Sequence, residues 1–325
     1  MGGRGAAGLP VVIDTDPGID DALALMLALS GPELDVRAVT TVGGNAGLDR
    51  TTANALRLLH LLGRDDIPVG AGADHPLVRC DSLPAESIHG TDGLGGISLE
   101  PAPRGADRRT AVDLIRDVVD ASAEPVTLIA LGPLTNVAAL LAAAPATAAR
   151  IGRVVMMGGG ARVLGNMTPA AEFNVWYDPE AAARVLSSGV PVTMVGLDVT
   201  RQAQTVPEDW AALHGGGPVA QAVLGMVEFY TGFYRATAGT EAIAQHDALA
   251  VASVMRPDLV TTRRLHVDVE CAGALTRGMT VVDVDGVGPG EPRTDVALEV
   301  DAAAFTSFLV ERVVGLGTRV GPADG

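Results

Sequence analysis

Residues 11–21 have the sequence VVIDTDPGIDD, and this stretch decides the fold that we predict for the chain. The apolar residues 11–13 are typical of a short buried strand, and the mostly apolar residues 22–29 are typical of a helix packed on a sheet. The aspartates between them therefore lie on a strand-to-helix turn, at the carboxyl end of the strand. Ligands of open α/β sheets bind at that end.

The turn carries four aspartates, Asp14, Asp16, Asp20 and Asp21, which are too many for helix capping alone. One or two of them, with Asp20 as the best candidate, could cap free amide groups and interact with the helix dipole. Four carboxylates this close repel one another and raise one another's pKa. Calcium accepts several carboxylate oxygens in a flexible geometry, whereas magnesium prefers more water. We therefore favour a metal site over an acidic cap with a solvated turn.

The composition indicates a globular α/β protein. Of the 325 residues, 48% are hydrophobic and only 3% are aromatic, so Ala, Val and Leu must fill the core, as in a parallel sheet covered by helices. The net charge of -16 argues against a nucleic-acid partner, which would need basic surfaces. Cys80 and Cys271 are the only cysteines, too few for a disulfide framework or a zinc ribbon.

The sequence predicts no membrane association. No run is long and apolar enough to span a bilayer. Residues 1–9 contain one arginine and no hydrophobic region, so we expect no signal peptide and a cytoplasmic protein.

Strand and helix patterns alternate along most of the chain. Predicted strands cover residues 11–13, 36–42, 67–69, 126–131, 154–157 and 192–195. Predicted helices cover residues 22–29, 50–62, 110–121, 135–144, 179–187, 207–237 with breaks at 215–217, 246–254 and 302–314. Repeated strand–helix units predict an open, mostly parallel, Rossmann-like sheet with helices on both faces.

The end of the chain and one long segment differ from this pattern. Residues 265–271, 279–284 and 296–300 alternate in polarity and are predicted to form a small antiparallel addition, either as an antiparallel edge of the sheet or as a small flanking sheet. Residues 74–107 are rich in Gly and Pro and lack periodicity, which indicates a functional, lid-like loop. We expect a single domain over residues 1–325, with residues 1–9 and 318–325 disordered.

Polar groups follow other predicted strands as well. Asn45 follows the second strand after two glycines, where asparagine is usually only a turn residue. The carbonyl of Leu131 lies at a strand end without a ladder partner, and calcium sites use such carbonyls. Residues 165–174, GNMTPAAEFN, combine amides with a carboxylate. This combination suits a polyhydroxyl ligand such as a sugar, because each hydroxyl both donates and accepts. The alternative is a hydrogen-bonded surface loop.

Two histidines, His246 and His89, could each have either a structural or a catalytic role. His246 and Asp247 begin an apolar helix, as an aspartate cap with a neighbouring histidine or as a general acid beside a metal ligand. His89 lies in the lid-like segment, where it is a surface residue or an acid brought in by closure.

Together these motifs resemble the inosine–uridine-preferring nucleoside hydrolase family. The central match is DTDPGIDD at residues 14–21. TVGGN at 41–45, IHG at 88–90, LGPLTN at 131–136, the loop at 166–174 and HD at 246–247 follow in the family's order. Six motifs in order, spanning nearly the whole chain, make the match specific.

The resemblance implies a calcium-dependent enzyme that hydrolyses the N-glycosidic bond of ribonucleosides to ribose and a free base. The implied metal ligands are Asp16, Asp21, the Leu131 carbonyl and Asp247, and Asp16 would also accept a proton from the attacking water. His246, with His89 as a further candidate, would protonate the leaving base. The implied substrate-binding residues are Asp20, Asn45, Asn166, Glu172, Phe173, Asn174, Tyr230 and Tyr234.

This chemistry agrees with general principles. Glycoside cleavage passes through an oxocarbenium-like state, which negative charge near the sugar stabilises. A metal ion lowers the pKa of a water so that a carboxylate can activate it. The segment 215–245 carries the least family signature, which leaves the base preference open, although His246 favours the branch that accepts purines and pyrimidines. Family resemblance also implies a homodimer or homotetramer.

Two rival functions deserve comparison. A haloacid-dehalogenase-like phosphatase also has Asp-x-Asp after a strand, but this chain lacks a suitable lysine beside a later acidic pair. An inactive nucleoside-binding or calcium-stabilised protein is the non-enzymatic alternative, and the intact aspartate set with His246 argues against it.

Overall fold

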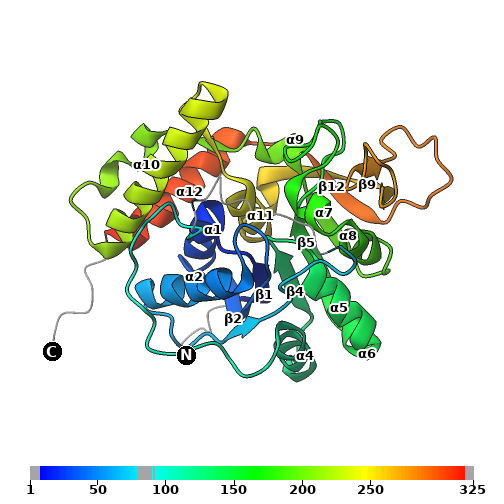
Figure 1. Cartoon of the computed structure of the whole chain (residues 1–325), viewed down its shortest axis with the longest axis horizontal. Helices are drawn as coiled ribbons and strands as arrows, with labels where there is room; N and C mark the ends of the chain where they lie inside the picture. The colour runs from blue at the N-terminus through cyan, green and yellow to red at the C-terminus, as the bar shows by residue number, and fades with distance from the viewer. Residues whose placement is uncertain (1–7, 80–89, 91, 319–325) are drawn as a thin grey trace, which may run out of the picture.

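The computed structural model describes residues 8–79, 90 and 92–318. An eight-stranded sheet forms its centre, in the order β3-β2-β1-β4-β5-β6-β12-β9 (Figure 1). The strands are β1 (Leu9–Thr15), β2 (Leu34–Thr41), β3 (Val69–Ala71), β4 (Val126–Ala130), β5 (Ile151–Met157), β6 (Val192–Val195), β9 (Val260–Leu265) and β12 (Thr294–Val300). All neighbours pair in parallel except β9, which is antiparallel to β12. The predicted Rossmann-like sheet is confirmed.

Helices cover both faces of the sheet, as the sequence predicts. Ile13 of β1 belongs to one apolar core, and Val12 on the opposite face of the strand belongs to the other. The first core is covered by α1 (Ile19–Ala28), α2 (Leu48–Leu61), α10 (Pro218–Ala238), α11 (His246–Met255) and α12 (Ala302–Gly317). The second core is covered by α4 (Ala111–Ala121), α5 (Thr135–Ala143) and α8 (Pro179–Leu186), with α6 (Pro145–Ala148) following α5. Because both faces are buried, the central strands are continuous apolar runs rather than alternating ones.

The prediction for the C-terminal strands is partly wrong. β12 does not belong to a separate antiparallel unit, because it joins the main sheet parallel to β6. Its antiparallel neighbour is β9, which begins at Val260 rather than at residue 265. Residues 261–264, TTRR, are four consecutive polar residues on an exposed edge strand, so they carry no apolar strand signal. A separate hairpin of β10 (Val267–Val269) and β11 (Thr280–Val282) is the small antiparallel addition.

Several short elements have no sequence signal. They are α7 (Phe173–Tyr177), α9 (Leu197–Thr200), the two-residue strands β7 (Gln204–Thr205) and β8 (Ile243–Ala244), and the 3-10 helices η1 (Pro207–Leu213) and η2 (Pro257–Leu259). The helix predicted over residues 207–237 is therefore η1 and α10, separated at the predicted glycine break. The predicted disorder at residues 1–9 is wrong for Leu9, whose amide donates to the Glu33 carbonyl and starts β1.

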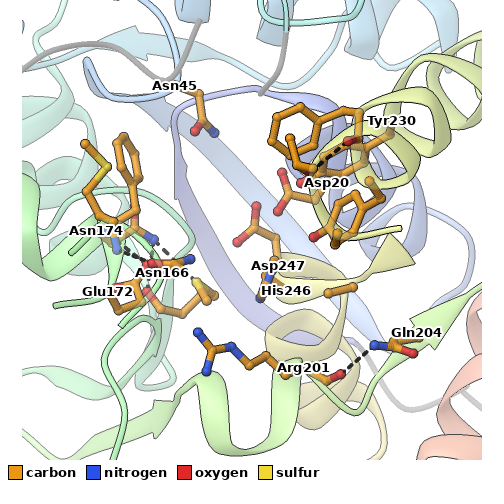
Figure 2. A pocket seen from close by; sticks show the side chains of 18 of the residues that line it. Asp20, Asn45, Asn166, Glu172, Asn174, Arg201, Gln204, Tyr230, His246 and Asp247 are labelled. Carbon is orange, nitrogen blue, oxygen red and sulfur yellow. Dashed lines mark hydrogen bonds between the residues drawn. The ribbon is translucent and has the colours of Figure 1, made fainter. Parts of the chain in front are cut away.

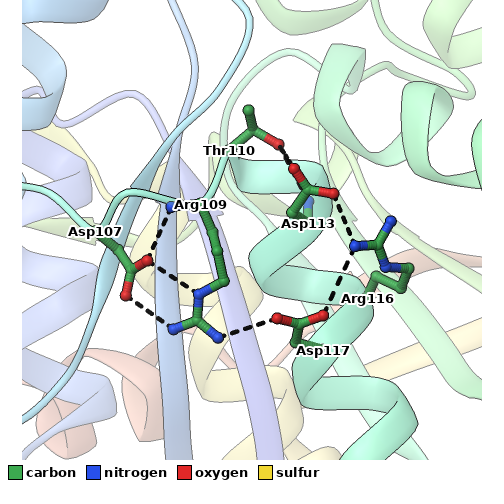
Figure 3. Close-up of polar contacts among 6 residues, drawn as sticks. All are labelled: Asp107, Arg109, Thr110, Asp113, Arg116 and Asp117. Carbon is green, nitrogen blue, oxygen red and sulfur yellow. Dashed lines mark hydrogen bonds and ion pairs between the residues drawn. The ribbon is translucent and has the colours of Figure 1, made fainter.

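The start of α4 shows how the charged surface is organised (Figure 3). The Thr110 side chain caps the helix by accepting a hydrogen bond from the Asp113 amide. Arg109 contacts Asp107 at 2.8 Å and Asp117 at 3.2 Å, and the hydrogen bond from Arg109 lowers the pKa of Asp107 to about 2. These pairs lie at the surface, where ion pairs contribute little to stability.

Part of the predicted lid-like loop packs firmly on the helices. The Asn54 side chain of α2 donates to the carbonyls of Asp92, at 2.8 Å, and of Pro17, at 3.1 Å. Gly95 lies so close to Phe229 of α10 that a Cβ there would be 2.7 Å from the ring. Residues 92–99 are thus tied to the aspartate turn, while residues 80–89, including His89, lie outside the described part of the chain. Within that part, no helix has the length and apolarity needed to cross a membrane.

Candidate functional site

The turn between β1 and α1 holds its aspartates in fixed positions. The Asp21 carboxylate accepts hydrogen bonds from the Gly18 amide at 2.9 Å, the Asp16 amide at 3.3 Å and the Thr15 hydroxyl. Asn45, at the end of β2, adds a further bond from its side-chain amide to Asp21 at 3.0 Å. The expected neighbourhood of Asn45 and the aspartate turn is therefore present.

Asp16 lies in a narrow space between two glycines. Its Oδ2 accepts the Asn45 amide at 2.7 Å. A Cβ atom on Gly44 would lie 2.0 Å from Oδ2, and one on Gly132 would lie 2.4 Å from Oδ1. Burial raises the pKa of Asp16 well above its usual value, and the charges of Asp21 and Asp20 raise it further. Asp16 is thus a buried carboxylate with a strong tendency to take up a proton.

Asp14 has a different environment from the other aspartates of the turn. Its Oδ1 accepts hydrogen bonds from Thr40 at 2.5 Å and from Asn136 at 2.8 Å, which joins β1 to β2 and α5. Burial raises its pKa to about 6. It does not line the pocket described below. Asp14 therefore ties strands together beneath the turn.

Distant carboxylates converge above the turn. Among the described residues, Asp20, Asp21 and Asp247 offer oxygen atoms that all lie within 4.8 Å of one another, and all three side chains are buried. The sequence-based metal set contained Asp16 where this cluster contains Asp20. Asp16 lies close by, since its charge adds to those of Asp20 and Asp21 in raising the pKa of Asp247, after the main effect of burial.

The donor set fits a hard divalent cation. Burial raises the pKa of Asp20 to about 8, and the Asp21 charge contributes next. Several buried carboxylates without a cation are costly, because each repels the others in a medium of low dielectric constant. A metal with oxygen ligands removes that repulsion. Glycine at positions 44 and 132 allows this placement of the Asp16 carboxylate, because a Cβ at either position would collide with it.

The Leu131 carbonyl belongs to a residue that directly follows the end of β4 and lines the pocket described below. It accepts a hydrogen bond from the Asn174 side chain at 2.6 Å, and the same amide group contacts the Met157 carbonyl at 3.2 Å. Asn174 therefore bridges the ends of β4 and β5 beside the aspartates.

Glu172 and Asn166 shape the wall next to Asn174. The Glu172 carboxylate caps α7 and accepts from the amides of Asn174 and Gly159, both at 2.9 Å, and of Val175 at 3.2 Å. Burial raises its pKa. The Asn166 carbonyl oxygen accepts the Phe173 amide at 2.9 Å, which leaves its NH2 group to face a ligand. The interpretation of residues 165–174 as an ordinary surface loop is therefore wrong for Glu172 and Asn174, which are buried.

These groups line one pocket of about 550 Å³ (Figure 2). In Figure 2 the carboxylates of Asp20 and Asp247 face each other near its centre. Asn166, Glu172 and Asn174 gather on one side, and Tyr230 lies on the other. Asp16 and Asp21 are buried and are not among the residues that line the pocket. The predicted site residues that line the pocket are Asp20, Asn45, Leu131, Asn166, Glu172, Phe173, Asn174, Tyr230, Tyr234, His246 and Asp247.

The aromatic wall comes from α10. The rings of Tyr230 and Tyr234 meet edge to face with centroids 5.2 Å apart, and Phe233 packs against both. Burial, followed by the Asp20 charge, raises the pKa of Tyr234 to about 12 and that of Tyr230 well above its usual value. Both phenols therefore keep their protons and can donate hydrogen bonds.

Sequence reasoning missed the residues that follow β6. Thr200 Oγ1 lies 2.8 Å from His246 Nδ1, and Asp198 accepts the amides of Ala161 and Arg162 at 2.6 and 2.8 Å. Arg201 lines the pocket and donates to the Gly165 carbonyl at 2.8 Å, next to Asn166. The rule that ligands bind at carboxyl ends of parallel strands would have pointed to this segment.

Comparisons with known proteins identify the family. The family model described as "Inosine-uridine preferring nucleoside hydrolase" matches residues 11–307. The chain belongs to this nucleoside hydrolase family. It is 46% identical over 308 residues to the "Pyrimidine-specific ribonucleoside hydrolase RihA" of Klebsiella pneumoniae (strain 342), covering 94% of this chain and 98% of the relative. The protein of the same name from Citrobacter koseri gives the same identity and coverage.

Solved structures of nucleoside hydrolases have the same fold. The "Purine-Preferring Ribonucleoside Hydrolase from Gardnerella vaginalis" superposes with a TM-score of 0.90 at 33% identity, covering 96% of this chain and 100% of the other. The "Plant nucleoside hydrolase - PpNRh1 enzyme" gives 0.89 at 35%, covering 94% and 99%. The chain is therefore an enzyme, a ribonucleoside hydrolase, as its motifs predicted.

Proposed function

We propose that this hydrolase binds a calcium ion at its aspartate cluster and uses Asp16 to activate the water that attacks C1′ of a ribonucleoside. The observation that carries the proposal is the convergence of the buried carboxylates of Asp20, Asp21 and Asp247 near Asp16, with Asp20 and Asp247 lining a pocket that amide side chains also line. The carboxylate cluster without the amide-lined pocket, or the pocket without the cluster, would not suggest this reaction.

The metal ligands in this proposal are Asp16, Asp21, Asp247 and the Leu131 carbonyl. Calcium is favoured over magnesium because the donors are carboxylates and a carbonyl in an irregular arrangement, which calcium tolerates better. When bound, the ion neutralises the cluster and makes a nearby water more acidic. Asp20 then serves the substrate rather than the ion, although its carboxylate belongs to the same cluster.

The side chains of the protein perform the remaining steps. Asp16 accepts the proton of the attacking water, a role that suits a carboxylate lying beside Asp20, Asp21 and the proposed ion. Asp20, Asn45, Asn166, Glu172 and Asn174 offer acceptors and donors for the ribose hydroxyls, and Phe173 packs beside them. Negative charge along this floor stabilises the oxocarbenium-like state in which positive charge develops on the sugar.

His246 is the proposed proton donor to the departing base. Tyr230 and Tyr234 are the proposed aromatic contacts of that base. We further propose that pyrimidine ribonucleosides are the better substrates. The relatives at 46% identity are named pyrimidine-specific, whereas the purine-preferring neighbour is 33% identical. The homo-oligomer stays a prediction from the family resemblance, and the cytoplasmic location stays a prediction from the sequence.

The test is a panel of uridine, cytidine, inosine and adenosine, with release of the free base measured by chromatography. The enzyme is dialysed against a chelator and then supplied with calcium or magnesium. We expect activity to return with calcium, to be highest on uridine or cytidine, and to be lost in Asp16→Asn. Asp49→Asn, an exposed carboxylate on α2, is the matched control and should retain activity. Full activity after thorough chelation would refute the metal proposal.

A further inference from the structure

The helix α9 brings a hydroxyl group to the catalytic histidine from a distant part of the sequence. Thr200, its last residue, is fully buried, and its Oγ1 lies 2.8 Å from Nδ1 of His246, at the start of α11. His246 also lines the pocket, beside Asp247 (Figure 2). Because Nδ1 contacts Thr200, the ring can present only Nε2 to a ligand.

We propose that Thr200 is a positioning residue that fixes the ring of His246 with Nε2 directed at the leaving base. The inference rests on the proposed function, in which His246 protonates the base. It adds the group that determines which nitrogen carries the transferred proton and where the ring points.

Proton accounting determines the direction of the Thr200 hydrogen bond. His246 acts as an acid from its imidazolium form, in which both nitrogens carry protons. Nδ1–H donates to Thr200 Oγ1, and Nε2–H donates to the base. When the C1′–N bond breaks, its electron pair stays on the base nitrogen, which takes the Nε2 proton. Histidine is left neutral with its proton on Nδ1, still donating to Thr200, while water adds to C1′ and gives its proton to Asp16.

The backbone of His246 is held independently of Thr200. The preceding residue, Gln245, donates its amide to the Ala203 carbonyl at 2.8 Å, and its side chain donates to Thr205 at 2.9 Å. The strand pair β7–β8 joins the same two segments. Removal of the Thr200 hydroxyl therefore frees the ring without releasing the start of α11.

This arrangement makes Thr200→Val a specific test. Valine has nearly the shape of threonine but cannot accept from Nδ1–H. A hydrogen bond to a charged group is typically strong enough that its loss slows the step it supports by roughly 10–100-fold. Thr200→Val should lose activity only on substrates whose leaving group needs a proton to depart. A 4-nitrophenyl riboside releases a stable anion and should be affected little.

The experiment compares kcat/KM on uridine and on 4-nitrophenyl riboside. The variants are Thr200→Val, Thr200→Ser, His246→Ala and the double variant Thr200→Val/His246→Ala. The matched control is Thr231→Val in α10, a buried hydroxyl without a hydrogen-bond partner among the described residues. We expect Thr200→Val to lose activity on uridine only, Thr200→Ser to restore most of it, and Thr231→Val to match the wild type.

The double variant separates positioning from general structural support. If Thr200 acts through His246, adding Thr200→Val to His246→Ala costs no further activity on uridine, because contacting residues are non-additive. Equal losses on both substrates, additive losses in the double variant, or unchanged activity of Thr200→Val would each overturn the inference. Failure of the wild type to release a base from any ribonucleoside would instead overturn the proposed function.

Discussion

The substitution Gly44→Ala tests whether the position of Asp16 controls the reaction. An added Cβ would lie 2.0 Å from Asp16 Oδ2, and such contacts are essentially never shorter than 3.0 Å, so the two groups must separate by about 1 Å. Gly132 confines the carboxylate on its other side. A displacement of this size at a reacting group lowers the rate by about 100-fold. We therefore expect kcat/KM for uridine to fall about 100-fold, with a loss of roughly 1–3 kcal/mol in stability from overpacking.

Gly47→Ala is the matched control in the same loop. A Cβ at Gly47 meets no atom within 4 Å, and its φ of -62° is compatible with alanine. Uracil release by chromatography measures activity, and urea unfolding measures stability. We expect Gly47→Ala to retain kcat/KM. A Gly44→Ala enzyme that is folded, takes up calcium and turns over like the wild type would refute the placement of Asp16 at the reacting water.

Three further predictions concern the proposed general base Asp16, the calcium ion and the surface ion pair of Arg109 with Asp107. Asp16→Ala should lower kcat by about 10²–10⁴-fold with an unchanged circular dichroism spectrum, and wild-type turnover would remove Asp16 from the mechanism. Calcium at 100 times its Kd should stabilise the chelated protein by about 2.7 kcal/mol in urea unfolding, whereas no shift would show that the cluster binds no ion. Arg109 lowers the pKa of Asp107 to about 2, so the pair stabilises the fold above roughly pH 4 and loses this effect as the pH falls toward 2. Arg109→Ala should thus cost under about 1 kcal/mol at pH 7, with a difference from wild type that shrinks below pH 4 in urea titrations.

The sequence was sufficient for the elements that build the site. Residues 11–29 predicted a strand, an acidic turn and a helix, and β1 and α1 have this arrangement. Asn45 and Leu131 could be placed near that turn because the carboxyl ends of parallel strands meet at one edge of a sheet. Asp247 was placed there only by the family resemblance, since β8, which precedes it, belongs to a separate two-stranded sheet. This rule depends on topology alone, so it works without any knowledge of side-chain packing.

Other features depend on contacts that no local pattern contains. Glu172 caps α7 through local amides, but its carboxylate also accepts the Gly159 amide, 13 positions away. Thr200 meets His246 across 46 positions, and Arg201 meets Gly165 across 36. The extent of β9 was missed because its edge position leaves most of its side chains exposed, which weakens the apolar signal that marks a strand. His89 lies outside the described residues, so its role stays a prediction.

The aromatic wall on α10 has a consequence for how such enzymes diversify. α10 packs against α1, α12 and η1 rather than directly on the strands of the central sheet. If α10 contacts the base as proposed, substitutions on its pocket side should change which leaving group is accepted and leave the proposed sugar and ion sites intact. Redesign for modified nucleosides should begin with libraries at Phe233, Tyr234 and Thr237, which line the pocket from the carboxyl-terminal half of α10.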